Sequence, residues 1–188
     1  MNPKITNVRS EKVISPWITL VTHTITTPEH PAPRDFHSLK QADYMGLLAV
    51  TADGKVICVR QYRPSLDRFT LELPAGLVDP GEEPATTAVR ELEEETGFRV
   101  AGKIHTLGGW AADTGRLENR IWAYFAPRAE PIAGAKTEPG VEVVLLSKAE
   151  FKEAMVSGAF DHALHVAVVG MALVQGHFSF QADDRSAS

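Results

Sequence analysis

The stretch from residue 71 to residue 98 constrains the fold more than any other part of this chain. It reads LELPAGLVDPGEEPATTAVRELEEETGF. The apolar residues up to Leu73 predict the end of a strand, and the prolines and glycines that follow predict a loop. Pro84 suits the first position of a helix, where its missing N–H would be unpaired anyway, and Gly97 suits a left-handed helix end. The stretch therefore predicts a strand, a loop and a helix over residues 84–96.

Three glutamates of the expected helix fall on one side of it. At about 100° per residue, Glu91, Glu94 and Glu95 are neighbours on the helix surface. The three anions repel one another and lie near the negative end of the helix dipole. This arrangement makes sense if a hard divalent cation, which prefers oxygen ligands, lies against it. A solvated acidic face is the alternative interpretation of the three glutamates taken alone.

The spacing of the stretch resembles the signature of the Nudix hydrolases. Gly76 is followed by five residues and Glu82, then by seven residues and the run RELEEETG at residues 90–97. The resemblance implies hydrolysis of a diphosphate that is linked to another moiety. It also implies two or three Mg²⁺ or Mn²⁺ ions as cofactor. The implied metal ligands are the carbonyl of Ala75 and the carboxylates of Glu91, Glu94 and Glu95, of which Glu94 and Glu95 are also expected to be catalytic.

Four further residues of the signature are expected to have structural roles. Arg90 and Glu82 resemble the pair that orients the loop against the helix. Gly76 and Gly97 resemble backbone positions that tolerate no Cβ.

Further residues resemble the branch of the family that hydrolyses ADP-ribose and other nucleotide sugars. The segments RQYR at 60–63 and ELPAG at 72–76 carry this resemblance. Arg60 and Arg63 lie on opposite faces of a strand by alternation, so we expect one of them to reach the substrate phosphates. We favour Arg63 and expect Arg60 to be a surface charge. Arg116 is a further candidate for contact with a ribose or a phosphate.

The N-terminal segment of that branch crosses to a partner subunit, and its aromatic residues stack on the base. Trp17 and Phe36 are the residues here that would do so. Stacking on a base contributes roughly 1–3 kcal/mol in single-stranded nucleic-acid complexes. The resemblance thus implies a homodimer formed through the N-terminal segment. A Trp17 that only covers the edge of the core is the alternative.

The proton acceptor is expected in the loop over residues 136–142. The branch that this chain resembles often uses a glutamate of this acidic loop. Glu138 is the first candidate and Glu142 the second, although Pro139 and Gly140 stand where acids are common. If neither reaches the attacking water, a metal-bound glutamate of the signature helix must accept the proton.

Hydrophobic periodicity divides the chain into an N-terminal β segment (1–42), a hydrolase domain (43–180) and a polar, disordered tail (181–188). A capping box at Ser147 and Glu150 predicts a helix to about residue 156, and Asp161 is expected to cap a last, apolar helix to about residue 175. The expected fold class is α/β with a mixed sheet, and the resemblance implies a Nudix-type α/β/α sandwich with a small N-terminal β appendage. The expected strands are residues 12–25 (broken at Pro16), 36–39, 44–51, 55–62, 69–73, 104–110, 120–125 and 141–146.

Composition limits the setting and the partners of the chain. The formal net charge of −5 gives no general attraction to nucleic acid or to an anionic membrane, so we expect neither as a partner. Cys58 is the only cysteine and lies in an apolar run, which excludes an intramolecular disulfide and favours a reducing, cytoplasmic location. The N-terminus has no apolar signal core. His162 and His165 fall on the last helix and are expected to be packed.

The leading interpretation is metal-dependent hydrolysis of the diphosphate of ADP-ribose or a related nucleoside-diphosphate sugar, giving AMP and a sugar phosphate. One alternative is a Nudix hydrolase of another substrate, such as a GDP-sugar, a dinucleotide or a nucleoside triphosphate. An alternative of another class is a non-catalytic nucleotide-sugar sensor. The intact set of carboxylates disfavours the sensor.

Overall fold

The computed structural model describes residues 5–181, which form two compact units. Unit 1 comprises the described residues up to Asp43 together with Trp110–Arg120. Unit 2 comprises Tyr44–Gly109 together with the described residues from Ile121 onward. The sequence gives no sign that residues 110–120 join the N-terminal segment. Of the predicted disordered tail, residues 182–188 lie outside the described residues, as do residues 1–4.

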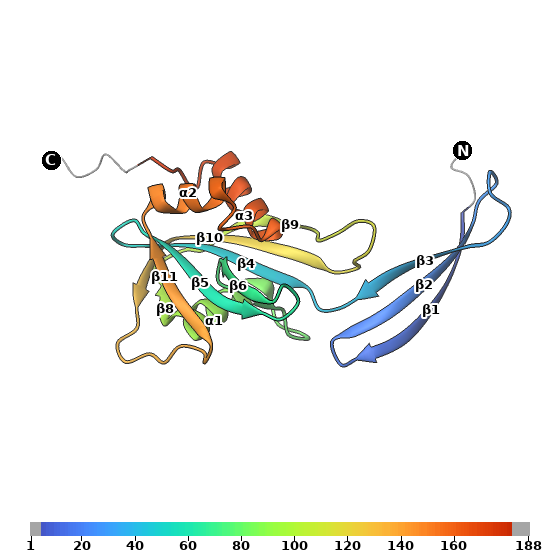
Figure 1. Cartoon of the computed structure of the whole chain (residues 1–188), viewed down its shortest axis with the longest axis horizontal. Helices are drawn as coiled ribbons and strands as arrows, with labels where there is room; N and C mark the ends of the chain where they lie inside the picture. Colours follow the sequence, from blue (N-terminus) through green and yellow to red (C-terminus); the bar gives the residue numbers. More distant parts are fainter. Residues whose placement is uncertain (1–4, 182–188) are drawn as a thin grey trace. The chain divides into compact units, whose positions relative to one another are not determined.

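Unit 1 contains a three-stranded antiparallel sheet, made of β1 (Thr6–Ser15), β2 (Ile18–Thr26) and β3 (Arg34–Lys40) in that order (Figure 1). The break predicted at Pro16 separates β1 from β2, and β1 begins earlier than the sequence indicates. Val21 and Asn119 are the buried residues among those described in this unit. The described part of unit 1 therefore has no apolar core of its own.

Unit 2 is built on a mixed sheet. Its strands are β4 (Tyr44–Thr51), β5 (Val56–Arg63), β6 (Arg68–Glu72), β7 (Ala75–Leu77), β8 (Phe98–Val100), β9 (His105–Ala111), β10 (Arg120–Pro131) and β11 (Val141–Leu146). The main order is β11-β5-β4-β10-β8, and β6, β7 and β9 pair with β5, β4 and β10. β4 and β10 are parallel, whereas β5 is antiparallel to β4, β6 and β11.

Helices cover both faces of this sheet. They are α1 (Pro84–Thr96), α2 (Lys148–Ser157) and α3 (Ala163–Val174). Successive residues of β4 point to opposite faces: Met45 packs in the core with Leu92 of α1, whereas a Cβ on Gly46 would lie 3.3 Å from Val168 of α3. Figure 1 shows α2 and α3 on one side of the sheet and α1 on the other. The predicted α/β/α sandwich with a mixed sheet is confirmed.

The predicted ends of α1 and the start of α2 are confirmed. Pro84 occupies the first turn of α1, and Gly97 (φ 68°) ends the helix in the left-handed region with its N–H donating to the carbonyl of Glu93. Both halves of the capping box at Ser147 and Glu150 are present at the start of α2. These ends depend on neighbouring residues only, which is why the sequence predicts them.

The predicted cap of the last helix is wrong. His162, not Asp161, is the N-cap of α3, with an extended backbone (φ −71°, ψ 106°). Nδ1 of His162 accepts the backbone N–H of His165 at 3.4 Å. Asp161 instead forms an ion pair with Arg68. An imidazole nitrogen therefore replaces the carboxylate that the sequence pattern favours one residue earlier.

The sequence does not predict the short strands β7 and β8. β7 lies within the expected loop and pairs with β4 from Tyr44 to Gly46. Pro74 and Gly76 obscure so short a strand, because proline and glycine usually mark breaks. β7 thereby places the predicted loop against the centre of the sheet.

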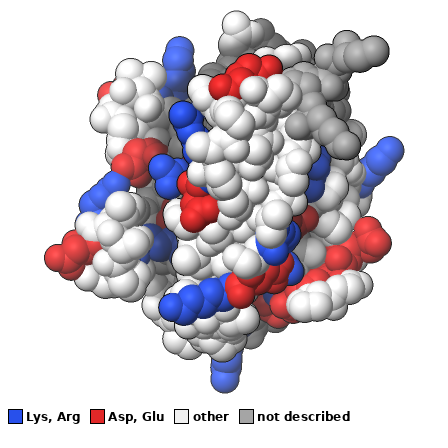
Figure 2. Space-filling model, turned by 90° about the vertical axis from the view of Figure 1, so that its right-hand side faces the viewer, with Lys and Arg blue, Asp and Glu red and all other residues white. Residues whose placement is uncertain are grey.

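Charges of both signs lie together on one face of the molecule. On the face drawn in Figure 2, Lys and Arg side chains are interspersed with Asp and Glu side chains. Among residues 5–181, no helix is long and apolar enough to cross a bilayer.

Candidate active site

Gly76 lies directly against a glutamate of α1. A Cβ built on Gly76 would lie 2.1 Å from Oε1 of Glu91, a distance that real Cβ atoms do not show. Gly76 pairs with Met45 across β7 and β4, so its backbone has no freedom to retreat. The close approach of strand and helix at this point therefore requires a residue without a side chain.

Glu95 is the most deeply buried carboxylate of the predicted metal site, with 4% of its surface exposed. Its Oε2 accepts the backbone N–H of Ala75 at 3.0 Å. Burial raises the pKa of Glu95 to about 8, and the charges of Glu91 and Glu138 add to this effect while the N–H of Ala75 opposes it. A buried carboxyl beside two other acids is ready to bind a cation, which would relieve both effects.

Arg90 connects the glutamates of α1 to the preceding loop. Its Nε and Nη2 donate to Glu82 at 3.2 and 3.1 Å. Its Nη1 donates to both Glu91 and Glu94 at 2.9 Å. Burial raises the pKa of Glu91, and the nearby Arg90 guanidinium opposes that rise. Glu91 and Glu94 thus share one positively charged group, so oxygens of both carboxylates lie close to a common point.

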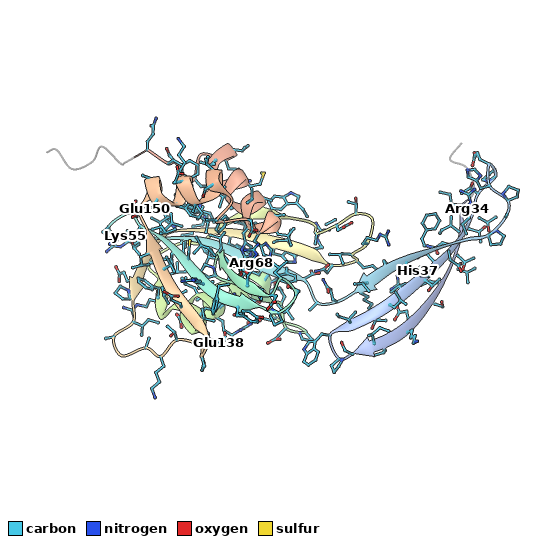
Figure 3. The ribbon with its side chains drawn as sticks, viewed as in Figure 1. Arg34, His37, Lys55, Arg68, Glu138 and Glu150 are labelled. Carbon is cyan, nitrogen blue, oxygen red and sulfur yellow. The ribbon has the colours of Figure 1, made fainter. Side chains whose placement is uncertain are left out.

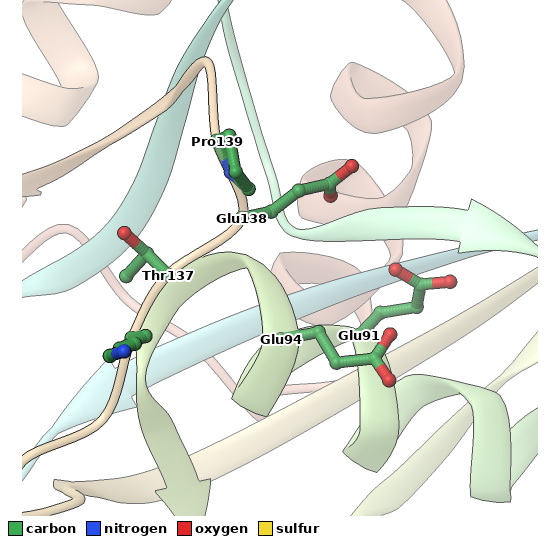
Figure 4. Close-up of a pocket in the computed structure, with 6 residues that line it drawn as sticks. Glu91, Glu94, Thr137, Glu138 and Pro139 are labelled. Carbon is green, nitrogen blue, oxygen red and sulfur yellow. The ribbon is translucent and has the colours of Figure 1, made fainter.

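A cavity of about 490 Å³ opens beside these carboxylates. Glu91 and Glu94 line it from α1, and the loop before β11 lines it with Glu138 and its neighbours (Lys136, Thr137 and Pro139). Figure 4 shows the carboxylates of Glu91, Glu94 and Glu138 on the same side of this loop. The N–H of Glu138 donates to the carbonyl of Glu94 at 2.9 Å, which ties the loop to the end of α1.

Arg63 points into a second cavity of about 400 Å³, which Tyr44, Arg68 and His162 also line. Its Nε and Nη2 donate to the buried Glu72 at 2.8 and 2.7 Å. Burial raises the pKa of Glu72, but hydrogen bonds from Arg63 and Thr70 prevail and lower it to about 2. Arg63 is therefore held in one orientation by a permanently ionised partner.

Arg60 and Glu142 lie apart from these two cavities. Arg60 is exposed, with its guanidinium 5.2 Å from the centre of the Phe69 ring. Glu142 is paired with Arg60 at 3.6 Å, across β11 and β5. Neither residue lines the cavity at Glu138 or the cavity at Arg63.

Unit 1 has its own cavity, of about 410 Å³. Phe36 and Arg116 both line it, so the structure brings together two of the predicted substrate contacts. Glu118, on its wall, accepts hydrogen bonds from Nη1 and Nη2 of Arg9 at 2.9 and 2.8 Å. Trp17, with 69% of its surface exposed, is not part of this lining. Figure 3 labels His37, which neighbours Phe36 on β3 and lines the same cavity.

The sequence gives no role to Glu72 and places His162 and His165 only as packed residues. In the part of the chain that the structure describes, these three form the one group of potential metal ligands whose donor atoms all lie within 4.8 Å of one another. Glu72 and His165 are each 1% exposed. A charged residue between two leucines in a strand was the available signal for Glu72. No local sequence pattern indicates that Glu72 lies near His162 and His165, because 90 or more residues separate Glu72 from them.

The chain is similar to known proteins of one family. A family model described as "NUDIX domain" matches residues 40–162. An ADP-ribose pyrophosphatase of Bacillus subtilis (strain 168) is 40% identical over 88 residues, 47% of this chain and 47% of that protein. A methanol dehydrogenase activator of Bacillus methanolicus is 34% identical over 106 residues, 55% of this chain and 57% of that protein.

The chain thus spans about half the length of these curated relatives. A solved structure, described as the crystal structure of an ADP compounds hydrolase, has the same fold. Its TM-score is 0.78 at 20% sequence identity, and the match covers 94% of this chain and 96% of that chain.

Proposed function

Because the chain belongs to the NUDIX domain family, we propose that it is a metal-dependent hydrolase of ADP-ribose or a related nucleoside-diphosphate sugar. The products would be AMP and a sugar phosphate. One observation carries the proposal: Glu91, Glu94 and Glu138 line a single cavity, and Gly76 lets Glu91 approach β7 closely. The name of the Bacillus subtilis relative, ADP-ribose pyrophosphatase, supports the choice of substrate.

The proposed cofactor is two or three Mg²⁺ or Mn²⁺ ions, held by the carboxylates of Glu91, Glu94 and Glu95 and the carbonyl of Ala75. Oxygen ligands of this kind suit such hard cations. When bound, these ions neutralise a diphosphate and lower the pKa of an attacking water. With the ions bound, the hydrogen bonds from Nη1 of Arg90 to Glu91 and Glu94 would break. The hydrogen bonds from Nε and Nη2 to Glu82 would remain.

Glu138 is the proposed proton acceptor. It lines the cavity that holds Glu91 and Glu94, and its backbone is fixed to α1. Figure 3 shows Glu138 in the loop that precedes β11. Glu142 is the weaker candidate, because its carboxylate is paired with Arg60 instead. A general base must lie within hydrogen-bond reach of the water that it deprotonates, and this favours Glu138.

Each unit has its own candidate residues for substrate contact. In unit 2, Arg63 keeps Nη1 free of the Glu72 pair, and it would offer that nitrogen to a phosphate. In unit 1, Phe36 would stack on the base and Arg116 would bind a phosphate or a ribose, since both line one cavity. Trp17 is a further stacking candidate because its ring is exposed.

Dimer formation through unit 1 and a cytoplasmic location complete the proposal. Exposed apolar side chains on β1, and on the turn after it, support a dimer, since a sheet that lacks a core gains stability when its apolar residues are covered. Four of them are more than half exposed (Val8, Val13, Ile14 and Trp17). The lone cysteine, Cys58, is buried and free, which supports a reducing, cytoplasmic location. The molar mass from light scattering tests the dimer, and the mass of a monomer would refute it.

A hydrolysis panel with Mg²⁺ tests the function. It compares ADP-ribose, other ADP- and GDP-sugars, NADH, diadenosine polyphosphates and deoxynucleoside triphosphates, with the products resolved. The proposal predicts that ADP-ribose or another ADP-sugar has the highest kcat/KM and yields AMP. If all substrates react equally, the metal chemistry stands and the substrate class is wrong. If none reacts, the proposed activity is wrong, and a non-catalytic nucleotide-sugar sensor becomes the leading alternative.

A further inference from the structure

Three consecutive residues in unit 2 are each tied to a different element. The N–H of Leu73 donates to Nδ1 of His165 in α3 at 3.1 Å. The carbonyl of Pro74 accepts a backbone N–H from β4 at 3.0 Å. The N–H of Ala75 donates to a buried carboxylate of α1 at 3.0 Å. We name Leu73–Ala75 the ligand turn, because it carries the carbonyl that is the proposed metal ligand.

We propose that His165 is a positioning residue for metal binding, whose imidazole holds the ligand turn so that the Ala75 carbonyl is presented to the ions. This inference rests on the proposed function. Leu73 is fully buried, so water cannot replace His165 as the acceptor of its N–H. An unsatisfied buried donor is costly, and the backbone would move to avoid it. Pro74 has no N–H of its own, so the turn has no second donor before Ala75.

The state of the imidazole suits this role. Nδ1 accepts a hydrogen bond, which places the proton of the neutral ring on Nε2. His165 is 1% exposed, and burial lowers its pKa to about 3. The ring therefore stays neutral and remains an acceptor throughout the physiological pH range. The ring of His162 stacks on it with 3.9 Å between centroids, which limits its rotation.

The same hydrogen bond argues against His165 as a metal ligand, although it lies in a cluster with Glu72 and His162. A metal on Nε2 would move the ring proton to Nδ1, where it would face the N–H of Leu73. A metal on Nδ1 would displace that N–H. Both oxygens of Glu72 already accept hydrogen bonds from Arg63. Glu72 and His165 thus already have hydrogen-bond partners and need no metal ion to satisfy them.

The test compares three variants of the full chain by Mn²⁺ titration without substrate, using electron paramagnetic resonance. His165→Phe keeps a ring but has no acceptor, whereas His165→Asn keeps an acceptor near the position of Nδ1. Val169→Ala is the matched control, because it removes packing one turn further along α3 and keeps the hydrogen bond between His165 and Leu73. Urea unfolding and the steady-state kinetics of each variant accompany the titration.

The proposal predicts a Mn²⁺ dissociation constant about tenfold higher in His165→Phe and within threefold of wild type in His165→Asn. Val169→Ala should lose stability and keep the wild-type constant. In the kinetics, His165→Phe should need more Mg²⁺ for half activation, with an unchanged KM for ADP-ribose at saturating Mg²⁺. This split between metal and substrate separates positioning from a general loss of structure.

A folded His165→Phe that binds Mn²⁺ as wild type does would overturn the proposal. If His165→Phe does not fold, His165→Asn decides: near-normal Mn²⁺ binding supports the role of the acceptor, and tenfold weaker binding refutes it. Failure of the proposed function looks different, because wild type itself would then bind no Mn²⁺ or hydrolyse no nucleotide sugar.

Discussion

The two units hold their polar side chains in different ways. In unit 2, Glu72, Glu95 and His165 are almost fully buried, and each is fixed by a partner from another part of the unit. In unit 1, the most connected side chain is Glu118, which remains 23% exposed while it binds Arg9, His23 and Ser38. Buried partners fix a geometry closely, whereas exposed ion pairs are screened and yield easily.

This difference is consistent with the separate roles that we propose for the two units. Metal chemistry needs carboxylates in fixed positions, and those lie around a core that includes Met45 and Leu92. Recognition of a base or a sugar tolerates some adjustment, and its proposed residues lie in a unit whose described residues include almost no buried ones. We therefore expect substitutions in unit 2 to affect turnover, and substitutions in unit 1 to affect substrate affinity and assembly.

The sharpest test of this division is Glu95→Gln. Glutamine keeps the acceptor for the N–H of Ala75 but removes the charge. We expect the fold to persist and kcat to fall by at least about 10³-fold, since a lost metal ligand removes several kcal/mol of charge stabilisation. The control is Glu93→Gln, an exposed glutamate of the same helix. Activity of Glu95→Gln within twofold of wild type would end the metal-site assignment.

Gly76→Ala tests the close approach of β7 and α1. The new Cβ would collide with Glu91, whose Oε1 lies 2.1 Å from its position. We expect kcat to fall by about 100-fold, because a displacement of about 1 Å at a catalytic site has that effect. Gly170→Ala is the matched control, since nothing lies within 4 Å of its Cβ. Equal activity of the two variants would show that Glu91 needs no fixed position.

The stability of unit 2 should depend on the protonation of His165. Burial holds its pKa at about 3 in the folded chain, against 6.5 for the free side chain. Below pH 6.5 the unfolded chain therefore binds a proton that the folded chain does not. The free energy of unfolding consequently decreases as the pH is lowered. Between pH 7 and pH 5 this effect is about 2 kcal/mol. The raised pKa of Glu95 changes stability in the opposite direction as the pH is lowered. Because Glu95 is present in both wild type and His165→Asn, its effect cancels when the two proteins are compared.

Urea unfolding of wild type and His165→Asn at a series of pH values, without metal, isolates this term. The advantage of wild type over the variant should shrink by about 2 kcal/mol from pH 7 to pH 5. If the difference in free energy of unfolding between the two proteins did not change with pH, the pKa of the buried imidazole would not be lowered, and this prediction would be wrong.

Phe36→Ala tests the part assigned to unit 1 and has the smallest expected effect. Loss of one stacked aromatic ring should raise KM for ADP-ribose about tenfold and leave kcat unchanged. Phe69→Ala is the matched control, because Phe69 lies in unit 2 and is 56% exposed against 55% for Phe36. A lower kcat in Phe36→Ala, with KM constant, would break the proposed division between the units.

Local features of the sequence were sufficient to predict the strand, loop and helix that carry the site. Pro84 and Gly97 act through their own backbone preferences, and the spacing of the glutamates follows from the helix itself. The sandwich follows from apolar strands such as β4, which is buried almost throughout. These predictions needed no knowledge of distant contacts.

The contacts beneath the site could not be predicted in this way. The hydrogen bond from Leu73 to His165 joins residues that are 92 apart in the sequence. Asp161, which was expected to cap α3, instead forms an ion pair with Arg68 of β6. The link of residues 110–120 to the N-terminal segment likewise depends on tertiary structure. Sequence patterns of period 2 or 3.6 carry no information on such pairs.

The most direct test of the central claim is the release of AMP from ADP-ribose as a function of Mg²⁺ concentration. The account predicts no reaction in EDTA, a saturable rise with Mg²⁺, and AMP with ribose 5-phosphate as the only products. Hydrolysis that persists in EDTA, or saturating Mg²⁺ with no AMP released, would contradict it.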